Sequence, residues 1–386
     1  MSPNETIGYA VVGCGVISPW HLRAIKEHVR GARLVAVCDE VPERAEARAR
    51  EFEVPKVYYR LDDLLADPEV DAISVCLPSG LHGEAVIAAS NAGKHAMTEK
   101  PIEITLEKID EMIAVTRRNG TRLGVIFQRR TSPLWQKVRE TVQAGKLGKM
   151  VLGDAYLKYY RSQEYYDSGA WRGTWALDGG GALMNQGVHL VDQLQWIMGP
   201  VEQIFSYADH LVRDIEVEDT TVSALKYRSG AFGTLIGTTS VIGSCEWEVE
   251  PEGPITVSQG AGQRVQATWQ PERIRVTRWG GLEHRLEFHG DRGTIMIEGE
   301  KIVRWVVPGE PEPRFDTRGI GSAASDPTAI GMSGHIIQLQ DFVDAIREGR
   351  DPMVTGEDAR AAVEIILAVY RSARTNQPVT LPLPGE

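Results

Sequence analysis

The stretch IGYAVVGCGVIS, residues 7–18, decides the fold of this chain. A short apolar run, Ile7–Val12, is followed by Gly13-Cys14-Gly15 and then by a helical pattern that begins near Ser18. Two glycines after a strand permit a tight turn and a close backbone approach to a pyrophosphate, and the following helix offers unpaired N–H groups. We therefore predict that this turn binds a dinucleotide. The alternative is an ordinary turn between a strand and a helix.

An acidic residue at the end of the next strand supports this interpretation. Asp39 lies 24 positions after Gly15, where a carboxylate can accept hydrogen bonds from the adenosine ribose. Glu40 follows directly and would repel a 2′-phosphate, although Arg44 could move in to receive one. The pattern therefore favours NAD over NADP. The alternative for Asp39 is a residue that only forms the turn.

Apolar runs alternate with helical patterns through the first third of the chain. This rhythm is typical of βαβ units in a doubly wound parallel sheet, so we expect an N-terminal Rossmann domain over residues 1–127. The expected strands are Ile7–Val12, Leu34–Val37, Ala72–Leu77, Lys94–Thr98 and Leu123–Phe127. The expected helices are Pro19–Val29 with Ser18 as its N-cap, Pro42–Phe52, Asp62–Asp67, His82–Ala92 and Thr105–Asn119.

The rhythm changes after about residue 128, and strand-like segments predominate up to about residue 307. We expect residues 128–386 to form a second α/β domain with a large open sheet, mainly antiparallel or mixed. The final helices, at about 335–375, are expected to pack near the domain junction. The stretch 245–281 is either an addition of strands to the sheet edge, with oligomer contacts, or a solvent-exposed excursion.

Composition excludes several classes of protein. The chain has 386 residues, 42% hydrophobic and 25% charged, which fits a globular protein of two to three domains. A net charge of −11 without a basic run argues against nucleic acid and anionic membranes as partners. No apolar stretch could span a bilayer, and no signal peptide is evident. Cys14, Cys38 and Cys76 lie in apolar runs and are expected to be buried free thiols, which favours the cytoplasm.

Glu99-Lys100-Pro101 follows the strand that is expected to end near the nicotinamide. The residue before a proline is restricted to extended or turn geometry, which holds Lys100 at the carboxyl end of the strand, where ligands bind. With the motifs around it, this segment resembles the Gfo/Idh/MocA family of nicotinamide-dependent oxidoreductases. The motifs, in order, are Gly13-Cys14-Gly15 with His21, Cys76-Leu77-Pro78 with His82, Glu99-Lys100-Pro101, Trp171-Arg172 before Gly179-Gly180-Gly181, Asn185-Gln186-Gly187-Val188-His189 with Asp192, and Gly293-Thr294.

The resemblance implies reversible hydride transfer between the nicotinamide and a secondary hydroxyl of a sugar, sugar derivative or inositol. It implies that Lys100 and His189 are catalytic, with a cis peptide bond before Pro101, and that the second sheet joins subunits into a homodimer or homotetramer. The implied cofactor-binding residues are Gly13, Gly15, Val16, Ile17, Asp39, Leu77, Pro78, His82, Glu99, Lys100, Gln128, Trp171 and Arg172. The candidate substrate-binding residues are Asn185, Asp192, Arg129 and Trp171. Tyr159, Tyr160, Tyr165 and Tyr166 are expected to be mostly scaffold, and Tyr160 is the one taken as a further substrate contact.

Removal of hydride from an alcohol requires a base that takes the hydroxyl proton and a cation that stabilises the developing alkoxide. His189 is a suitable base and Lys100 a suitable cation, and Asn185, His189 and Asp192 share one helix face. Relatives often carry Asp where this chain has Asn185, and an amide cannot take a proton but can orient a hydroxyl. Asp192 either orients His189 or caps a turn. Of the two residues Arg129 and Arg130, one is expected to face substrate and the other to form a structural ion pair, and no metal site is predicted.

Two other functions fit the same motifs less well. An NAD-dependent glycosidase would oxidise its substrate transiently and then eliminate the aglycone, but branches with that activity often lack the lysine at position 100. A non-catalytic NAD-binding regulator would have no need of both Lys100 and His189.

Overall fold

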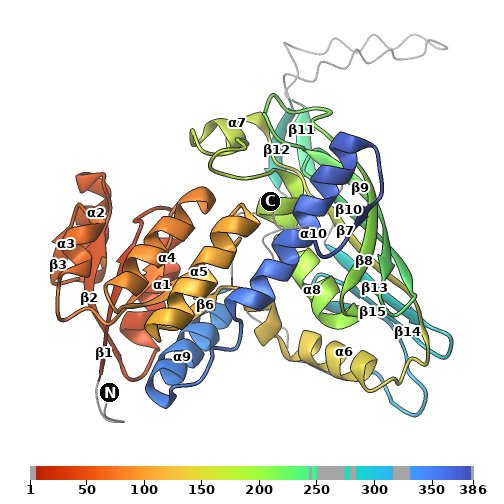
Figure 1. Cartoon of the computed structure of the whole chain (residues 1–386). Coiled ribbons are helices and arrows are strands. Elements are labelled where there is room, and N and C mark those ends of the chain that lie inside the picture. Colours follow the sequence, from red (N-terminus) through yellow and green to blue (C-terminus); the bar gives the residue numbers. More distant parts are fainter. Residues whose placement is uncertain (1–5, 243–245, 250–273, 279–283, 316–330, 384–386) are drawn as a thin grey trace, which may run out of the picture.

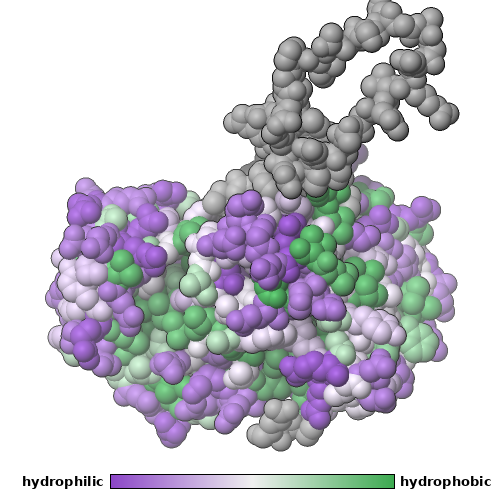
Figure 2. Space-filling view, turned by 90° about the horizontal axis from the view of Figure 1, so that it is seen from above, coloured by the Kyte–Doolittle hydropathy of each residue, from purple (hydrophilic) through white to green (hydrophobic). Residues whose placement is uncertain are grey.

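The structure is a computed structural model, and it describes residues 6–242, 246–249, 274–278, 284–315 and 331–383. Two β-sheets with their helices lie side by side, joined by the two final helices (Figure 1). Apolar surface appears as separate green patches on both halves of the molecule (Figure 2). Among the described helices, none combines the length and the apolar character that crossing a membrane would require.

The N-terminal sheet has six parallel strands in the order β3-β2-β1-β4-β5-β6, which confirms the predicted Rossmann arrangement. Its central strand β1 is buried at every position, as expected for a strand covered on both faces. Its strands are β1 (Ile7–Val12), β2 (Ala32–Cys38), β3 (Lys56–Tyr58), β4 (Ala72–Val75), β5 (His95–Thr98) and β6 (Leu123–Val125). Its helices are α1 (Ser18–Glu27), α2 (Pro42–Phe52), α3 (Leu61–Leu65), α4 (His82–Asn91) and α5 (Leu106–Asn119).

The second sheet is mixed, in the order β15-β14-β13-β7-β10-β9-β8-β16. Strands β7 and β10 run parallel, whereas the other pairs described in this sheet are antiparallel. Helices α8 and α10 pack on β7 and β8 and cover one face, and the opposite face is open. The strands are β7 (Met150–Lys158), β8 (Val201–Asp209), β9 (Thr220–Tyr227), β10 (Phe232–Thr238), β13 (Arg285–Gly290), β14 (Thr294–Glu298), β15 (Lys301–Val306) and β16 (Val379–Thr380).

The final helices connect the two halves. Helix α9 (Ser333–Glu348) packs on α1, and its Phe342 ring meets the Tyr9 ring of β1 edge to face with centroids 6.5 Å apart. Helix α10 (Gly356–Thr375) contacts α5 and β6 at one end and α8 and β8 at the other. Hydrophobic packing therefore crosses the predicted boundary at residue 127, and the division into two domains stays a prediction. The remaining helices are α6 (Pro133–Gln143), α7 (Gln163–Asp167) and α8 (Val188–Met198).

The stretch 245–281 does not extend the large sheet in its described part. Strands β11 (Glu246–Val249) and β12 (Ile274–Arg278) pair antiparallel with each other in a separate sheet. The rest of that stretch, including Cys245, lies outside the described residues. Cys14, Cys38 and Cys76 are buried free thiols, as predicted.

Candidate active site

A cavity of about 1500 Å³ opens between the carboxyl ends of the parallel strands and the covered side of the second sheet. Most of the predicted site residues line it. On the cofactor side these are Gly13, Gly15, Val16, Ile17, Asp39, Leu77, Pro78, Glu99, Lys100, Gln128, Trp171 and Arg172. On the substrate side they are Arg129, Asn185 and His189, together with Trp171 again. Their individual contacts with cofactor or substrate stay predictions.

The glycine turn has the geometry that a bound pyrophosphate needs. Gly13 has φ +88°, and a Cβ there would lie 2.5 Å from the carbonyl oxygen of Cys76, so only glycine fits. A Cβ on Gly15 would meet nothing within 4 Å, so this backbone borders open space. The expected N-cap role of Ser18 is wrong, because α1 begins at Ser18 itself and its hydroxyl donates to the Gly15 carbonyl at 2.8 Å. The turn fits a dinucleotide held on the N-terminus of α1.

Asp39 stands at the end of β2 and is already bonded to the turn. Its Oδ2 accepts the Cys14 N–H at 2.7 Å and its Oδ1 accepts the Val41 N–H at 2.9 Å. A carboxylate offers about four lone-pair sites, so two remain for ribose hydroxyls. Arg44 also lines the cavity, within reach of the same region.

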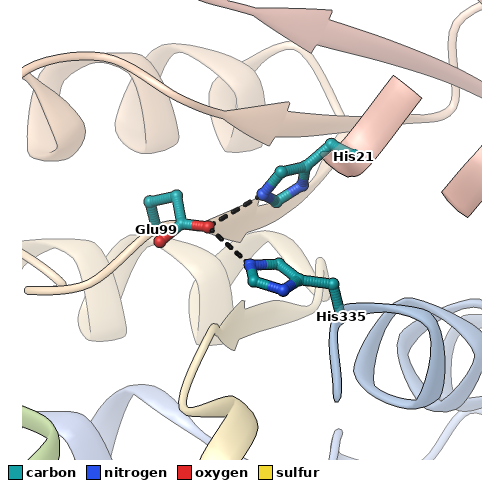
Figure 3. Close-up of side chains that lie close together, drawn as sticks. All are labelled: His21, Glu99 and His335. Carbon is teal, nitrogen blue, oxygen red and sulfur yellow. Dashed lines mark hydrogen bonds and ion pairs between the residues drawn. The ribbon is translucent and has the colours of Figure 1, made fainter. Parts of the chain in front are cut away.

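Glu99 is a buried carboxylate at the end of β5 that binds two histidines from distant segments (Figure 3). Its Oε1 accepts hydrogen bonds from Nε2 of His21 at 2.9 Å and from Nε2 of His335 at 3.2 Å. Burial alone would raise the pKa of Glu99, but the two histidine contacts outweigh it and hold that pKa well below its usual range. The three ligand atoms lie within 4.8 Å of one another, and direct hydrogen bonds account for their spacing, so we assign no metal to this cluster.

Lys100 leaves β5 through a cis peptide bond to Pro101, as predicted. Its Nζ donates to the backbone carbonyl of Asn185 at 2.9 Å, which joins the Rossmann side of the cavity to the second half of the chain. Burial lowers the pKa of Lys100, and the charges of Arg172 and Arg129 add to this effect, whereas Glu99 and Asp178 oppose it.

His189 is buried in α8 and lines the cavity beside the edge of the Phe127 ring. Burial lowers its pKa well below the usual value, and the positive charges of Lys100 and Arg129 add to this. The ring is therefore neutral near pH 7 and has a lone pair that can take up a proton. Its Nδ1 is buried without a hydrogen-bond partner among the residues that the structure describes.

Asp192 does not reach the cavity, which contradicts its predicted role in binding substrate. Its carboxylate forms a two-point ion pair with Arg130, with Oδ2 at 2.9 Å from Nε and Oδ1 at 2.6 Å from Nη2. The helical spacing correctly placed Asp192 near His189 on α8 but could not show that the carboxylate turns toward Arg130. Of the arginine pair, Arg130 is therefore the structural member, and Arg129 faces the cavity.

Two further predicted contacts are corrected. Tyr160 lies outside the cavity, under the guanidinium of Arg213, and its neighbour Tyr159 lines the wall instead, because successive side chains of an extended segment point to opposite sides. His82 is buried and does not line the cavity either. Its ring nitrogens contact the carbonyl oxygens of Pro101 at 2.8 Å and Leu77 at 2.9 Å, so it holds two cavity segments together.

The glycine-rich loop that contains Trp171 and Arg172 places the Arg172 guanidinium between two aromatic rings. The guanidinium of Arg172 lies 4.4 Å from the ring centroid of Tyr165 and 4.6 Å from that of Trp171, and its Nη1 donates to the Tyr165 hydroxyl at 2.7 Å. Arg161 lines the same wall. Arg129, Arg161 and Arg172 therefore bring positive charge to the cavity, within a protein of net negative charge.

Sequence reasoning missed two buried carboxylates that shape the segment carrying Asn185. Glu218 accepts the N–H groups of Gly181 at 2.8 Å and Leu183 at 2.9 Å, at the start of a π-helix, Ala182–Gly187. Burial raises the pKa of Glu218 to about 7, against the effect of these bonds. Asp178 accepts a hydrogen bond from Nδ2 of Asn185 at 2.7 Å. Asp178 directly precedes the Gly179-Gly180-Gly181 motif, which could have drawn attention to it, whereas Glu218 belongs to no motif quoted above.

Comparison with protein families agrees with this geometry. A model described as "Oxidoreductase family, NAD-binding Rossmann fold" matches residues 7–127, and one described as "GFO/IDH/MocA C-terminal domain" matches residues 135–296. The chain belongs to the GFO/IDH/MocA family. The resemblance inferred from the motifs is thus confirmed, and this family member binds NAD.

Relatives within the GFO/IDH/MocA family are dehydrogenases and reductases. The scyllo-inositol 2-dehydrogenase (NAD(+)) of Bacillus subtilis is 25% identical over 96% of this chain and 95% of its own length. The 1,5-anhydro-D-fructose reductase of Ensifer adhaerens is 26% identical over 75% of this chain and 91% of its own. The crystal structure of the WlbA dehydrogenase from Bordetella pertussis in complex with NADH and UDP-GlcNAcA is 31% identical, with a TM-score of 0.80 and coverage of 98% and 100% of the two chains. The chain is therefore an NAD(P)-dependent oxidoreductase.

The Arg130–Asp192 pair generates a stability prediction. Asp192→Asn should lower the free energy of unfolding by about 3–5 kcal/mol, because it removes the buried one of the two carboxylates that pair with the Arg130 guanidinium. Chemical denaturation measures this loss, and KM for substrate should not change. The control is Asp110→Asn, which removes the 53% exposed partner of Arg360 and should cost less than about 1 kcal/mol. A raised KM in an Asp192→Asn protein of unchanged stability would restore the substrate-binding role.

Proposed function

We propose that this protein transfers hydride reversibly between NAD and a secondary hydroxyl of a sugar derivative. One observation carries the proposal: the glycine turn, the Lys100 ammonium and the neutral imidazole of His189 all face one cavity. When bound, the nicotinamide takes up or supplies hydride at its C4 carbon. The chain's own residues then have to manage the proton and the charge of the hydroxyl oxygen.

In this proposal His189 takes the hydroxyl proton and Lys100 stabilises the negative charge that develops on the oxygen. The low pKa of His189 keeps it neutral and able to accept, but also makes it a weak base. Lys100 and Arg129 contribute to that low pKa, so an anionic substrate group beside Arg129 would raise it again and strengthen the base. An anionic substrate group would therefore assist proton uptake by His189.

Positive charge on the substrate wall favours a sugar acid or a nucleotide-linked sugar over a neutral polyol. Arg129 and Arg161 line that wall, Arg172 lines the same cavity, and guanidinium groups bind carboxylates and phosphates at two points. The WlbA dehydrogenase, 31% identical, is in complex with a ligand of this kind, UDP-GlcNAcA. A screen of uronic acids, UDP-linked sugar acids, aldoses and inositols with NAD⁺ and NADP⁺, followed by NADH absorbance, tests the proposal. Release of an aglycone without net NADH would contradict it.

The free thiols Cys14, Cys38 and Cys76 support the further proposal that the protein functions in the reducing cytoplasm.

Lys100 should be essential for turnover and nearly neutral for cofactor binding. Lys100→Met removes the cation at the reacting oxygen, so we expect kcat to fall about 10²–10³-fold. The Kd for NADH, measured by fluorescence titration, should stay within about twofold because the phosphate turn is untouched. Lys26→Met, on the exposed surface of α1, is the matched control. Full turnover in Lys100→Met would refute the assignment.

Asp39 should set the cofactor preference. Asp39→Ala removes both the acceptor for ribose hydroxyls and the charge that repels a 2′-phosphate, so kcat/KM for NAD⁺ should fall about tenfold or more while that for NADP⁺ holds or rises. The measurement is the ratio of the two kcat/KM values. Glu43→Ala, in the first turn of α2, should leave this ratio unchanged. An unaltered ratio in Asp39→Ala would exclude the ribose assignment.

We also propose that the open face of the eight-stranded sheet joins two copies of the chain. Cross-strand partners on this face expose large apolar side chains, with Tyr207 66% exposed opposite Val222 and Phe232 58% exposed opposite Leu152. Large exposed apolar side chains on one face of a sheet are typical of an association surface.

Light scattering after size-exclusion chromatography tests this interface. The wild-type protein should be a dimer or tetramer, and the double substitution Tyr207→Glu/Phe232→Glu should reduce its mass to that of a smaller species, because two charges would be desolvated at the contact. Met353→Glu, at an exposed apolar residue elsewhere, is the control. A monomeric wild-type protein would contradict the proposal.

A further inference from the structure

Asp178 is a buried carboxylate that the mechanism above does not use. It is 1% exposed, immediately precedes Gly179, and does not line the cavity. Its Oδ2 accepts the Gly173 N–H at 2.9 Å, and its Oδ1 accepts a hydrogen bond from Nδ2 of Asn185 at 2.7 Å. A buried carboxylate is costly unless its lone pairs are used, and here one of them binds a side chain of the cavity wall.

The charge state of Asp178 decides how it binds Asn185. Burial raises its pKa to about 6, against the hydrogen bonds of Gly173 and Asn185 and the charges of Arg172 and Lys100. Above pH 7 the carboxylate is mostly ionised and can only accept. The amide nitrogen of Asn185 must then face Asp178.

The amide oxygen of Asn185 is consequently turned to the opposite side. There Nε2 of Gln186 donates to it at 3.2 Å, and the same nitrogen is bonded to the Tyr165 hydroxyl at 2.9 Å. Asn185 and Gln186 both line the cavity. An amide oxygen has two lone pairs and the bond from Gln186 uses one, so the Asn185 oxygen can accept one further hydrogen bond.

The same residue also holds Lys100. The backbone carbonyl of Asn185 accepts the Lys100 ammonium at 2.9 Å, from within the π-helix Ala182–Gly187. A displacement of Asn185 would therefore move both an acceptor on the wall and the partner of the cation.

We propose that Asp178 is a positioning residue. Its carboxylate fixes the side-chain amide of Asn185, so that the amide oxygen points toward a substrate hydroxyl and the backbone carbonyl of Asn185 stays against Lys100. This inference rests on the proposed dehydrogenase function and adds a specificity element to it. In this proposal two substrate hydroxyls have different partners. The reacting hydroxyl gives its proton to His189, and a neighbouring hydroxyl donates a hydrogen bond to the side-chain oxygen of Asn185.

Exchange of the two side chains tests the proposal. Asp178→Asn leaves two amides face to face, either of which can flip, and Asn185→Asp brings two carboxylates to within 2.7 Å of each other. Each single variant should lose about 10- to 100-fold in kcat/KM for substrate, the value of a hydrogen bond to a charged group. The double variant Asp178→Asn/Asn185→Asp restores one amide and one carboxylate with an acceptor oxygen at position 185. It should return to within about fivefold of wild type, because the coupled pair is re-formed.

The readouts separate a positioning role from a structural one. Substrate binding to the enzyme–NADH complex, measured by calorimetry, should weaken in both single variants and recover in the exchange variant, whereas the Kd for NADH stays constant throughout. Asp67→Asn, which alters a buried carboxylate on the far side of the Rossmann half, should lose stability only.

Three outcomes would overturn the inference. These are unchanged kcat/KM in Asp178→Asn, unchanged kcat/KM in Asn185→Asp, and an exchange variant no better than the worse single variant. If the Asp178→Asn protein does not fold, the Asn185→Asp variant still tests the positioning role, because Asp178 is unchanged in that variant. Failure of the dehydrogenase proposal would appear separately: the wild-type protein would then reduce NAD⁺ with none of the substrates in the screen.

Discussion

A buried carboxylate needs hydrogen-bond donors, and those of Glu99 come from segments more than 200 residues apart in sequence. His21 of α1 and His335 of α9 donate to the same oxygen, and the other oxygen accepts the Lys100 backbone N–H at 3.2 Å. These bonds fix the end of β5 relative to the helices on either side of it. The position of Lys100, and through it the contact with Asn185, depends on that one charge being satisfied.

Sequence patterns were sufficient for the parts of the fold that depend on local order. The apolar runs and the glycine turn of residues 7–18 predicted the parallel sheet, because a buried strand followed by a helix has few other arrangements. The short strands β3 and β16 escaped notice, since two or three residues carry no periodicity. Cavity-lining residues were found wherever a motif placed them at the carboxyl end of a strand.

The errors share a physical cause. Spacing along the helix put Asp192 on the face of His189, but it could not show that Arg130 draws the carboxylate away from the cavity. Tyr160 was one of four neighbouring tyrosines, and no sequence signal showed which of them faces the cavity. His335, Asp178 and Glu218 were missed because their roles exist only after distant segments meet. A buried acid acquires its function from the donors around it, and those donors come from tertiary structure rather than from neighbouring sequence.

Helix α9 gives the chain an unusual order of completion. Leu339, Phe342 and Val343 belong to the same apolar core as Ile7 and Tyr9, so the first strand stays incompletely covered until the last quarter of the protein exists. During synthesis on the ribosome, the nucleotide-binding half cannot mature while its own residues emerge. That cover is supplied by α9, which is made after strands β7 to β15 of the second half. A nascent chain that stalls before residue 333 would expose that core to chaperones and proteases.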